Sequence, residues 1–260
     1  MKISVPLLAD PGAAAVLCDL DGTLAPIVDR PEDAVVPRRA RAALEPIADR
    51  YALSAIVTGR RAAAAREIVG LDGLTYVGIH GFELLHPGEE AASPSPALRG
   101  HEDDARRFAD GLWSGELDGA GIRVEDKGPI VALHWRGAGS ETEALELLER
   151  IAGEARATGL VAHRGRKVLE LRPAVRIDKG LATGDLLVEV GARAALYAGD
   201  DRTDLDAFRA LARLRDDGTL EAAVRVGVRS SEGPSEIVTE SDLIVEGPEE
   251  MPPLLEILGG

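Results

Sequence analysis

The sequence predicts an α/β protein in which a doubly wound parallel sheet carries a smaller, inserted α+β domain. Short, continuous apolar runs alternate with longer segments of helical period, as in parallel sheets that are covered on both faces. In the middle of the chain, strand-like segments follow one another through short turns, which favours an antiparallel sheet. A chain of 260 residues is long enough to form two domains of this kind.

The larger domain is expected to consist of two stretches of chain, residues 1–96 and 174–260. Its continuous apolar runs predict strands, at Ala15–Leu20, Leu53–Val57, Leu74–Ile79, Ala194–Ala198, Val224–Val228 and Leu243–Val245. The segments of helical period between them predict helices, at Arg38–Arg50, Arg61–Val69 and Leu205–Leu214. Such sheets bind ligands beyond the carboxyl ends of their strands, so polar residues at those ends are the candidate functional residues.

The inserted domain is expected to cover residues 97–173. It follows a stretch rich in Pro, Gly, Ser and Glu, Pro87–Pro96, which predicts a loop. Two segments in the insert predict helices, at Glu102–Trp113 and Glu141–Thr158. Four more predict strands, at Ile122–Glu125, Ile130–Arg136, Leu160–His163 and Val168–Arg172. Short turns between neighbouring strands indicate an antiparallel sheet with helices on one face.

Composition limits the partners that the chain can have. A formal charge of -15 argues against nucleic acid or an anionic membrane as the main partner. We find no apolar stretch near the ~20 residues of a membrane span and no signal-peptide pattern. The lone cysteine, Cys18, allows no internal disulfide and is expected to be a small buried apolar residue. These features suit a cytoplasmic protein with a small-molecule ligand.

The strongest chemical motif is Asp19-Leu20-Asp21-Gly22-Thr23-Leu24, which directly follows an apolar strand. Two carboxylates this close to a buried strand are costly to hold together without a cation. Mg²⁺ suits them because it prefers oxygen ligands and keeps room for water and phosphate. One Asp can attack phosphorus and the other can transfer protons, although an acidic turn without a ligand is the alternative interpretation.

A second acidic motif, Gly199-Asp200-Asp201-Arg202-Thr203-Asp204, also follows an apolar strand and precedes a helical segment. Asp200, Asp201 and Asp204 offer metal ligands or acceptors that support a metal's ligands. Acidic residues are common at helix N-termini, and an acidic helix cap is therefore the alternative. The presence of both acidic motifs in one chain favours a metal site.

Two further residues complete a phosphoryl-transfer site. Thr58 ends the second strand and can hold a phosphoryl oxygen, although an ordinary helix cap explains it as well. Lys179, before a helical pattern, can balance the carboxylates and stabilise charge on a transferring phosphoryl group. Its alternative is a solvated surface lysine. Together the motifs predict in-line transfer of a phosphoryl group to an Asp, and the sequence has no Walker-type nucleotide loop.

These motifs, in this order, resemble the haloacid dehalogenase-like superfamily of phosphatases. Within that superfamily the chain resembles trehalose-6-phosphate phosphatases from about Val16 to its C-terminus. Seven stretches carry the resemblance: Asp19–Ile27, Thr58–Arg60, Gly78–Glu83, Glu125–Gly128, His134–Arg136, Gly165–Pro173 and Gly199–Phe208. The family has an acidic residue where this chain has Leu205, so the charge near that helix start is reduced.

The resemblance implies a Rossmann-like core with an inserted cap of type C2 that closes over the core. It implies Asp19 as the nucleophile and Asp21 as the general acid and base. It also implies a Mg²⁺ site made by the Asp19 carboxylate, the Asp21 carbonyl and Asp200, supported by Asp201 and Asp204.

The resemblance further implies a set of substrate-binding residues. In the core these are Gly59, Arg60, His80, Gly81 and Glu83, and in the cap they are Glu125, Lys127, His134 and Glu170. A site that hydrogen-bonds sugar hydroxyls discriminates against analogues that lack them. The alternatives are a surface ion pair for Glu125 and Lys127, a half-buried structural histidine for His134, and an exposed strand position for Glu170.

The sequence therefore predicts a Mg²⁺-dependent phosphoric monoester hydrolase acting on trehalose 6-phosphate, as a monomer or weak dimer. A phosphatase for a glucosyl- or mannosyl-glycerate phosphate is the main alternative, since only cap residues would differ. A phosphomutase is a weaker one. A sugar-phosphate-binding protein without activity is the alternative of another class, but the intact acidic, Thr58 and Lys179 set counts against it.

Overall fold

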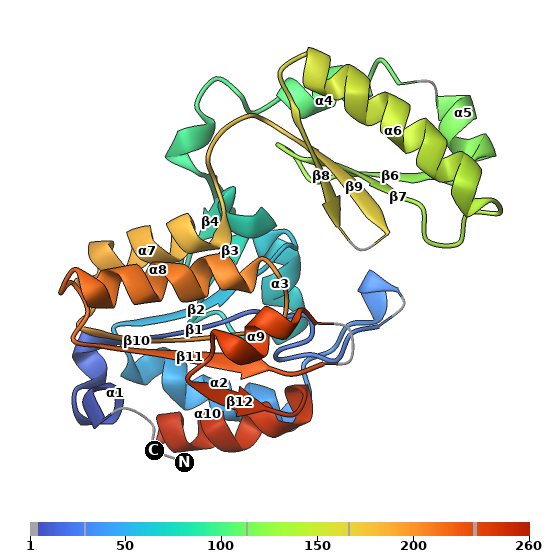
Figure 1. The fold of residues 1–260 in the computed structure, drawn as a ribbon. Helices are drawn as coiled ribbons and strands as arrows, with labels where there is room; N and C mark the ends of the chain where they lie inside the picture. The colour runs from blue at the N-terminus through green and yellow to red at the C-terminus, as the bar shows by residue number, and fades with distance from the viewer. Residues whose placement is uncertain (1–4, 29, 113, 166, 231–232) are drawn as a thin grey trace. The chain divides into compact units, whose positions relative to one another are not determined.

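The computed structural model describes residues 5–28, 30–112, 114–165, 167–230 and 233–260. The chain divides into two compact units, the first made of Met1–Pro94 and Ile177–Gly260 and the second of Ser95–Arg176 (Figure 1). Trp113, where a helix was predicted to end, and Arg166, in one of the quoted motifs, lie outside the described residues.

The first unit contains an eight-stranded sheet in the order β12-β11-β10-β1-β2-β3-β4-β5. These strands are β1 (Ala14–Cys18), β2 (Leu53–Val57), β3 (Thr75–Gly78), β4 (Glu83–Leu85), β5 (Ser93–Pro94), β10 (Ala194–Gly199), β11 (Ala222–Val228) and β12 (Leu243–Val245). The pairing is parallel from β12 to β3, which confirms the predicted mostly parallel α/β core.

The edge formed by β4 and β5 adds an antiparallel part that the prediction of a parallel sheet did not include. Both strands pair antiparallel to their neighbours, and β5 lies inside the stretch predicted to be a loop, Pro87–Pro96. Strand β4 returns beside β3 after only a short turn, and such a connection can join only antiparallel strands. Pro94 fits β5 because an edge strand has an outer side that needs no backbone donor.

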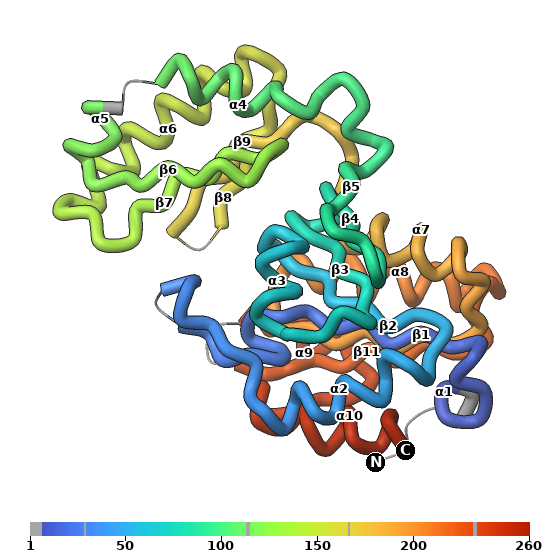
Figure 2. The backbone as a smooth tube through the Cα atoms, turned by 180° about the vertical axis from the view of Figure 1, so that it is seen from behind, coloured from blue at the N-terminus to red at the C-terminus, as the bar shows by residue number. Residues whose placement is uncertain are grey.

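Helices cover both faces of this sheet, as Figure 2 shows. In β1, Val16 and Cys18 pack into one apolar cluster, whereas Ala15 and Leu17 pack into the other. The first cluster includes residues of α1 (Val5–Ala9), α2 (Arg38–Arg50), α3 (Ala62–Val69) and α10 (Met251–Gly259). The second includes residues of α7 (Lys179–Glu189), α8 (Asp204–Asp216) and α9 (Ser235–Thr239). The core is therefore doubly wound, and Cys18 is buried as predicted.

The second unit contains a four-stranded antiparallel sheet in the order β6-β7-β9-β8. Its elements are α4 (Asp104–Ala109), α5 (Ser114–Gly119), β6 (Arg123–Asp126), β7 (Val131–His134), α6 (Glu141–Ala157), β8 (Val161–Gly165) and β9 (Val168–Arg172). Leu133 and Leu169 are buried with Leu148 and Ile151 of α6 on one face. The opposite face carries the charged residues that the sequence singled out. Among the described residues, no helix is long and apolar enough to span a bilayer.

Candidate active site

Three of the predicted site residues directly follow neighbouring parallel strands. Asp19 follows β1, Thr58 follows β2 and Asp200 follows β10. The backbone amide of Asp19 donates to the carbonyl of Ala198 (2.8 Å), and that of Thr58 donates to the carbonyl of Val77 (2.9 Å). All three residues are buried. The sheet therefore brings them together at the edge where such folds bind ligands.

Lys179 contributes a buried positive charge to this cluster. It is the first residue of α7, whose N-terminus is capped by the Asp178 side chain. Its Nζ donates to Asp19 Oδ1 (2.6 Å) and to Asp204 Oδ1 (2.8 Å), and Lys179 is only 2% exposed. This excludes the surface-lysine alternative, because a buried ammonium needs charged or polar partners of this kind.

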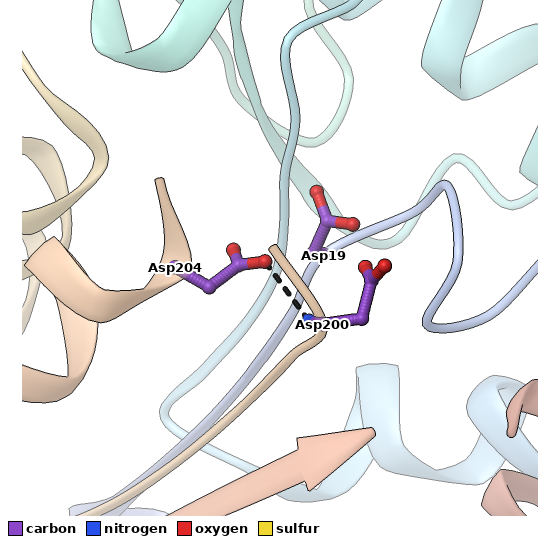
Figure 3. Close-up of side chains that lie close together, drawn as sticks. All are labelled: Asp19, Asp200 and Asp204. Atoms are coloured by element: carbon purple, nitrogen blue, oxygen red, sulfur yellow. Dashed lines mark hydrogen bonds between the residues drawn. The ribbon is translucent and has the colours of Figure 1, made fainter. Parts of the chain in front are cut away.

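The Asp204 carboxylate connects the loop after β10 to α8. Its Oδ2 accepts hydrogen bonds from the backbone amides of Asp200 and Asp201, both at 3.0 Å. Its Oδ1 accepts from Lys179 and from the hydroxyl of Tyr197 (2.8 Å). Figure 3 shows the first of these amide contacts, with the carboxylates of Asp19, Asp200 and Asp204 close together. Both oxygens of Asp204 are thus occupied by protein donors.

Two glycines make this close packing of carboxylates possible. Gly22 has φ of +88°, and a Cβ added there would overlap the carboxylate of Asp200. A Cβ at Gly199 would overlap the side chain of Asp204. The Asp200 carboxylate instead accepts a hydrogen bond from the hydroxyl of Thr23 (3.1 Å). The glycines of the two acidic motifs therefore set the distance between the acidic groups.

The carboxylates of Asp19, Asp200 and Asp204 lie close together and are buried, so their pKa values are raised. Burial raises the pKa of Asp19 well above its ordinary value, and Lys179 only partly opposes this. Burial, followed by the charges of Asp204 and Asp201, raises the pKa of Asp200 to about 8. Burial also raises the pKa of Asp204 to about 6, against the effect of Lys179. Burial lowers the pKa of Lys179, but Asp19 and Asp204 more than reverse this, so its ammonium stays charged.

The donor set fits a hard divalent cation. One carboxylate oxygen from each of Asp19, Asp200 and Asp204 lies within 4.8 Å of the others. Because Asp204 already has four protein donors, Asp19 and Asp200 are the carboxylates best able to turn toward a cation. Asp201 differs from them: burial acts against its ionisation, but Lys179 and the Thr203 hydroxyl bring its pKa down to about 2. A bound cation would relieve the repulsion that raises the pKa of Asp200.

Asp21 makes its closest contacts with Arg60. The guanidinium donates from Nε to Asp21 Oδ2 and from Nη2 to Asp21 Oδ1, both at 2.7 Å. Its Nη1 also donates to the carbonyl of Pro31 (2.8 Å). Bidentate pairs of this kind fix the orientation of the carboxylate. Arg60, expected to bind substrate, is therefore also the residue that holds Asp21.

The remaining core residues surround Thr58. The Thr58 hydroxyl accepts from the backbone amide of Arg60 (3.2 Å), and the backbone amide of His80 donates to the Thr58 carbonyl (2.9 Å). His80 has φ of +58°, and a Cβ at Gly59 would overlap its imidazole. Glu83 Oε1 accepts from the amide of Ala62 (2.6 Å), so this carboxylate stabilises the N-terminus of α3.

Gly81, the last of the core residues expected to bind substrate, approaches α7 instead. Its φ is +108°, and a Cβ there would lie 3.0 Å from the Cβ of Ala182. The backbone conformation and this close approach both require a glycine.

The four predicted residues of the second unit form two hydrogen-bonded groups on its sheet. His134 Nε2 lies 2.7 Å from Glu125 Oε2, and this hydrogen bond lowers the pKa of Glu125. Lys127 Nζ donates to Glu170 Oε1 at 3.2 Å, while Arg172 donates to Glu170 Oε2. Glu170 is 5% exposed, so the alternative of an exposed strand position is wrong.

Two residues, one in the charged cluster of each unit, were not singled out from the sequence. Tyr197 lies in an apolar strand run, where an aromatic residue is ordinarily a core residue. Arg172 belongs to the Gly165–Pro173 motif, which could have indicated its role. Leu205, where the family has an acidic residue, is buried in the apolar cluster between the sheet and the α7 layer. Its side chain contributes to the core rather than to the charged site.

Solved structures share the fold of this chain. A haloacid dehalogenase-like hydrolase from Bacteroides thetaiotaomicron has the same fold, with 15% identity, a TM-score of 0.63 and coverage of 93% of this chain and 98% of that one. A solved trehalose-6-phosphate phosphatase related protein is 26% identical with a TM-score of 0.74, covering 94% of this chain and 96% of that one.

The trehalose-phosphatase family model matches residues 17–243, and the chain belongs to this family. A trehalose-phosphate phosphatase of Mycobacterium marinum is 39% identical over 209 residues, which are 76% of this chain and 51% of that protein. The chain spans 15% to 51% of the length of the first curated relatives that it matches.

Proposed function

We propose that this protein hydrolyses trehalose 6-phosphate to trehalose and phosphate through an aspartyl-phosphate on Asp19. The observation that carries the proposal is the buried Lys179 ammonium, which contacts Asp19 at 2.6 Å beside the Asp200 carboxylate. A binding protein needs neither a desolvated carboxylate nor a lysine directed at it. Membership of the trehalose-phosphatase family supports the choice of substrate.

In the first half of the reaction, an Asp19 oxygen attacks phosphorus and the bond from phosphorus to the sugar oxygen breaks. Asp21 donates a proton to the departing sugar oxygen, and it must give up one contact with Arg60 to carry that proton. In the second half, Asp21 takes a proton from water while the water oxygen attacks phosphorus. The bond between the Asp19 oxygen and phosphorus breaks, phosphate leaves, and the Asp19 carboxylate is restored.

We propose that Lys179, Thr58 and a divalent cation together stabilise the negative charge on the phosphoryl group. Asp19 and Asp200 would hold the cation with the carbonyl of Asp21, and we propose that it is Mg²⁺. When bound, this cation would neutralise negative charge on the phosphoryl oxygens. The Lys179 ammonium and the hydroxyl of Thr58 would stabilise the charge that develops on the same group. Asp204 and Asp201 keep the loop after β10 in place.

We propose that the charged face of the second unit's sheet recognises the sugar. Glu125, Lys127, His134 and Glu170 supply donors and acceptors that are already oriented by one another. The burial of Glu170, beside the half-buried Lys127, makes an unmatched hydroxyl costly, which favours one hydroxyl pattern over others. In the first unit, Gly59, Arg60, His80, Gly81 and Glu83 are proposed to contribute the remaining contacts.

Phosphate release from a panel of esters, with and without Mg²⁺, tests the proposal. The panel contains trehalose 6-phosphate, glucose 6-phosphate, sucrose 6-phosphate and the phosphorylated glycosylglycerates. We expect Mg²⁺-dependent release with a strong preference for trehalose 6-phosphate. Preference for another ester would keep the Asp19 chemistry and reject the sugar assignment. Absence of release from folded, Mg²⁺-bound protein would reject the phosphatase itself.

A further inference from the structure

Tyr197 brings a hydroxyl into the charged cluster from the middle of an apolar strand. Its side chain is fully buried, and its ring meets Phe208 of α8 edge-on, with the ring centroids 6.1 Å apart. Its hydroxyl donates to Asp204 Oδ1 at 2.8 Å. Packing alone does not require this hydroxyl, because a phenylalanine ring would fill the same space.

The hydroxyl completes the set of donors around a carboxylate that solvent cannot reach. Asp204 is 0% exposed, and its Oδ1 accepts from both Tyr197 and Lys179, while its Oδ2 accepts from two backbone amides. A carboxylate oxygen has two lone pairs, so each oxygen is satisfied. Removal of the phenolic donor would leave one of these lone pairs unpaired in a buried site.

Lys179 is the group that would respond to such a loss. Its Nζ is shared between Asp19 Oδ1 at 2.6 Å and Asp204 Oδ1 at 2.8 Å. If Asp204 loses a donor, its uncompensated charge draws the ammonium more strongly toward itself and away from Asp19. The contact with Asp19 is the one that the phosphoryl-transfer reaction uses.

We propose that Tyr197 is a positioning residue that directs Lys179 toward Asp19 by satisfying Asp204 Oδ1. The inference rests on the proposed phosphatase function. It adds Tyr197 as the fourth residue in a chain of contacts that begins at Asp19 and passes through Lys179 and Asp204. Tyr197 does not touch the reacting atoms, and its effect reaches them only through Asp204 and Lys179.

The variant Tyr197→Phe tests this role, because it removes only the hydroxyl. Its matched control is Tyr76→Phe, since Tyr76 is also fully buried in a core strand but donates to the carbonyl of Leu71, outside the charged cluster. For both variants we would measure kcat and KM on a small aryl phosphate with saturating Mg²⁺, and the melting temperature. Calorimetry of orthovanadate binding adds a readout that does not depend on turnover.

For Tyr197→Phe we expect kcat to fall about tenfold and vanadate to bind about tenfold more weakly, while KM changes less than about twofold. Tyr76→Phe should keep the kcat and the vanadate affinity of the wild type. Both variants should lose some thermal stability, because Tyr197→Phe leaves the buried Asp204 carboxylate, and Tyr76→Phe the half-buried Leu71 carbonyl, without one donor.

Three outcomes would overturn the inference. One is an unchanged kcat and vanadate affinity in Tyr197→Phe, and another is an equal loss of kcat in both variants. The third is loss of cooperative folding in Tyr197→Phe alone, which would assign the hydroxyl to folding. A wild-type protein without Mg²⁺-dependent hydrolysis of any ester would instead reject the proposed function, and the role of Tyr197 with it.

Discussion

Burial and the neighbouring carboxylates shift the pKa of Lys179 in opposite directions. An isolated buried ammonium would lose its proton, whereas two carboxylates within hydrogen-bonding distance hold the charge in place. The same arrangement keeps the buried Asp19 carboxylate beside a positive charge. Asp19 is the carboxylate that we propose as the nucleophile.

The variant Asp19→Asn tests the nucleophile directly. An amide cannot attack phosphorus, so we expect steady-state phosphate release to fall by at least ~10³-fold. Asp72→Asn is the control, because the Asp72 side chain is 92% exposed and lies outside the site. Turnover retained in folded Asp19→Asn would remove Asp19 as the nucleophile.

A second residue-scale prediction concerns Lys127, which pairs with the buried Glu170. Lys127→Ala should lower kcat/KM for trehalose 6-phosphate ~10²-fold or more, with little effect on a small aryl phosphate that carries no sugar. Lys167→Ala, in the same unit but paired with Glu141 at the surface, should leave both substrates unaffected. Equal losses on both substrates would show that Lys127 does not read the sugar.

At the scale of single residues, the sequence motifs were enough to predict most of the residues of the candidate site. Asp19, Thr58, Lys179 and Asp200 were singled out from the sequence, and the structure places them together, although their roles remain predictions. Tyr197 was not singled out, because its apolar neighbours give it the pattern of a core residue. Only the three-dimensional contact with Asp204 distinguishes it from an ordinary buried aromatic residue.

At the scale of elements, the loops that leave β1 and β10 determine the spacing of the site. Both loops begin directly after the last strand residue, so the parallel register of Cys18 with Ala198 carries over to the acidic residues beyond it. Gly22, in the loop after β1, and Gly199, the last residue of β10, allow carboxylates from different strands to approach closely. The elements thus hold the acidic groups at distances that suit a cation.

Gly22→Ala tests this spacing, with Gly88→Ala as a matched control. Both glycines have positive φ, +88° and +81°, but a Cβ at Gly88 meets no atom within 4 Å. We expect Gly88→Ala to cost about 1 kcal/mol of unfolding free energy, from backbone strain alone. Gly22→Ala should cost about 3 kcal/mol and weaken Mg²⁺ binding, because the Asp200 carboxylate must move. Denaturant unfolding and calorimetry would measure both, and equal behaviour of the two variants would contradict the role of Gly22.

The sequence predicted the longer strands and also the short strand β12, but it missed helix α10 and the short strands β4 and β5. Strands of five or six residues, such as β2 and β10, give clear apolar runs. Strands β4 and β5 have only three and two residues, too few for an alternating pattern to show. The predicted helix Glu102–Trp113 is shorter in the structure, where α4 ends at Ala109.

At the scale of the whole molecule, a net charge of -15 must be reconciled with the anionic substrate that we propose. The proposed site offers positive charge locally, through Lys179 and the cation that Asp19 and Asp200 would hold. Carboxylates that repel one another without a metal would become ligands when a cation is bound. The stability of the protein should therefore depend on pH and on Mg²⁺ together.

The pKa of Asp200, about 8 against an ordinary value of 3.8, sets the direction of that dependence. Between these values the folded protein without metal holds a proton that the unfolded chain has lost, so its stability falls as pH rises. Below about pH 8, Mg²⁺ must displace this proton, at ~1.4 kcal/mol per pH unit. The rise in melting temperature on adding Mg²⁺ should consequently be larger near pH 8.5 than near pH 6.

Asp200→Asn provides the control for this experiment. The amide cannot be deprotonated and is a poorer ligand, so the variant should show a small Mg²⁺ effect at both pH values. A shift in melting temperature that is the same for the wild type at both pH values would contradict the assignment of Asp200 as a ligand.

The α/β class and the mostly parallel core could be predicted from the sequence because both depend on long, repeated patterns. The antiparallel edge could not, since the return of β4 beside β3 depends on a turn of a few residues. The positions of the two units in the chain were also expected from composition, and the structure draws the division at Pro94 and Arg176.

The split of the first unit along the chain bears on the order in which the protein can fold. In the central sheet, β1 pairs with β10, and Ala14 faces Ala194, so this pairing must wait until most of the chain has left the ribosome. The second unit is continuous from Ser95 to Arg176 and holds its own apolar cluster, so it can fold earlier. During synthesis, β1 would have one side unpaired until β10 emerges. This interval is when the chain is most open to aggregation or to chaperone binding.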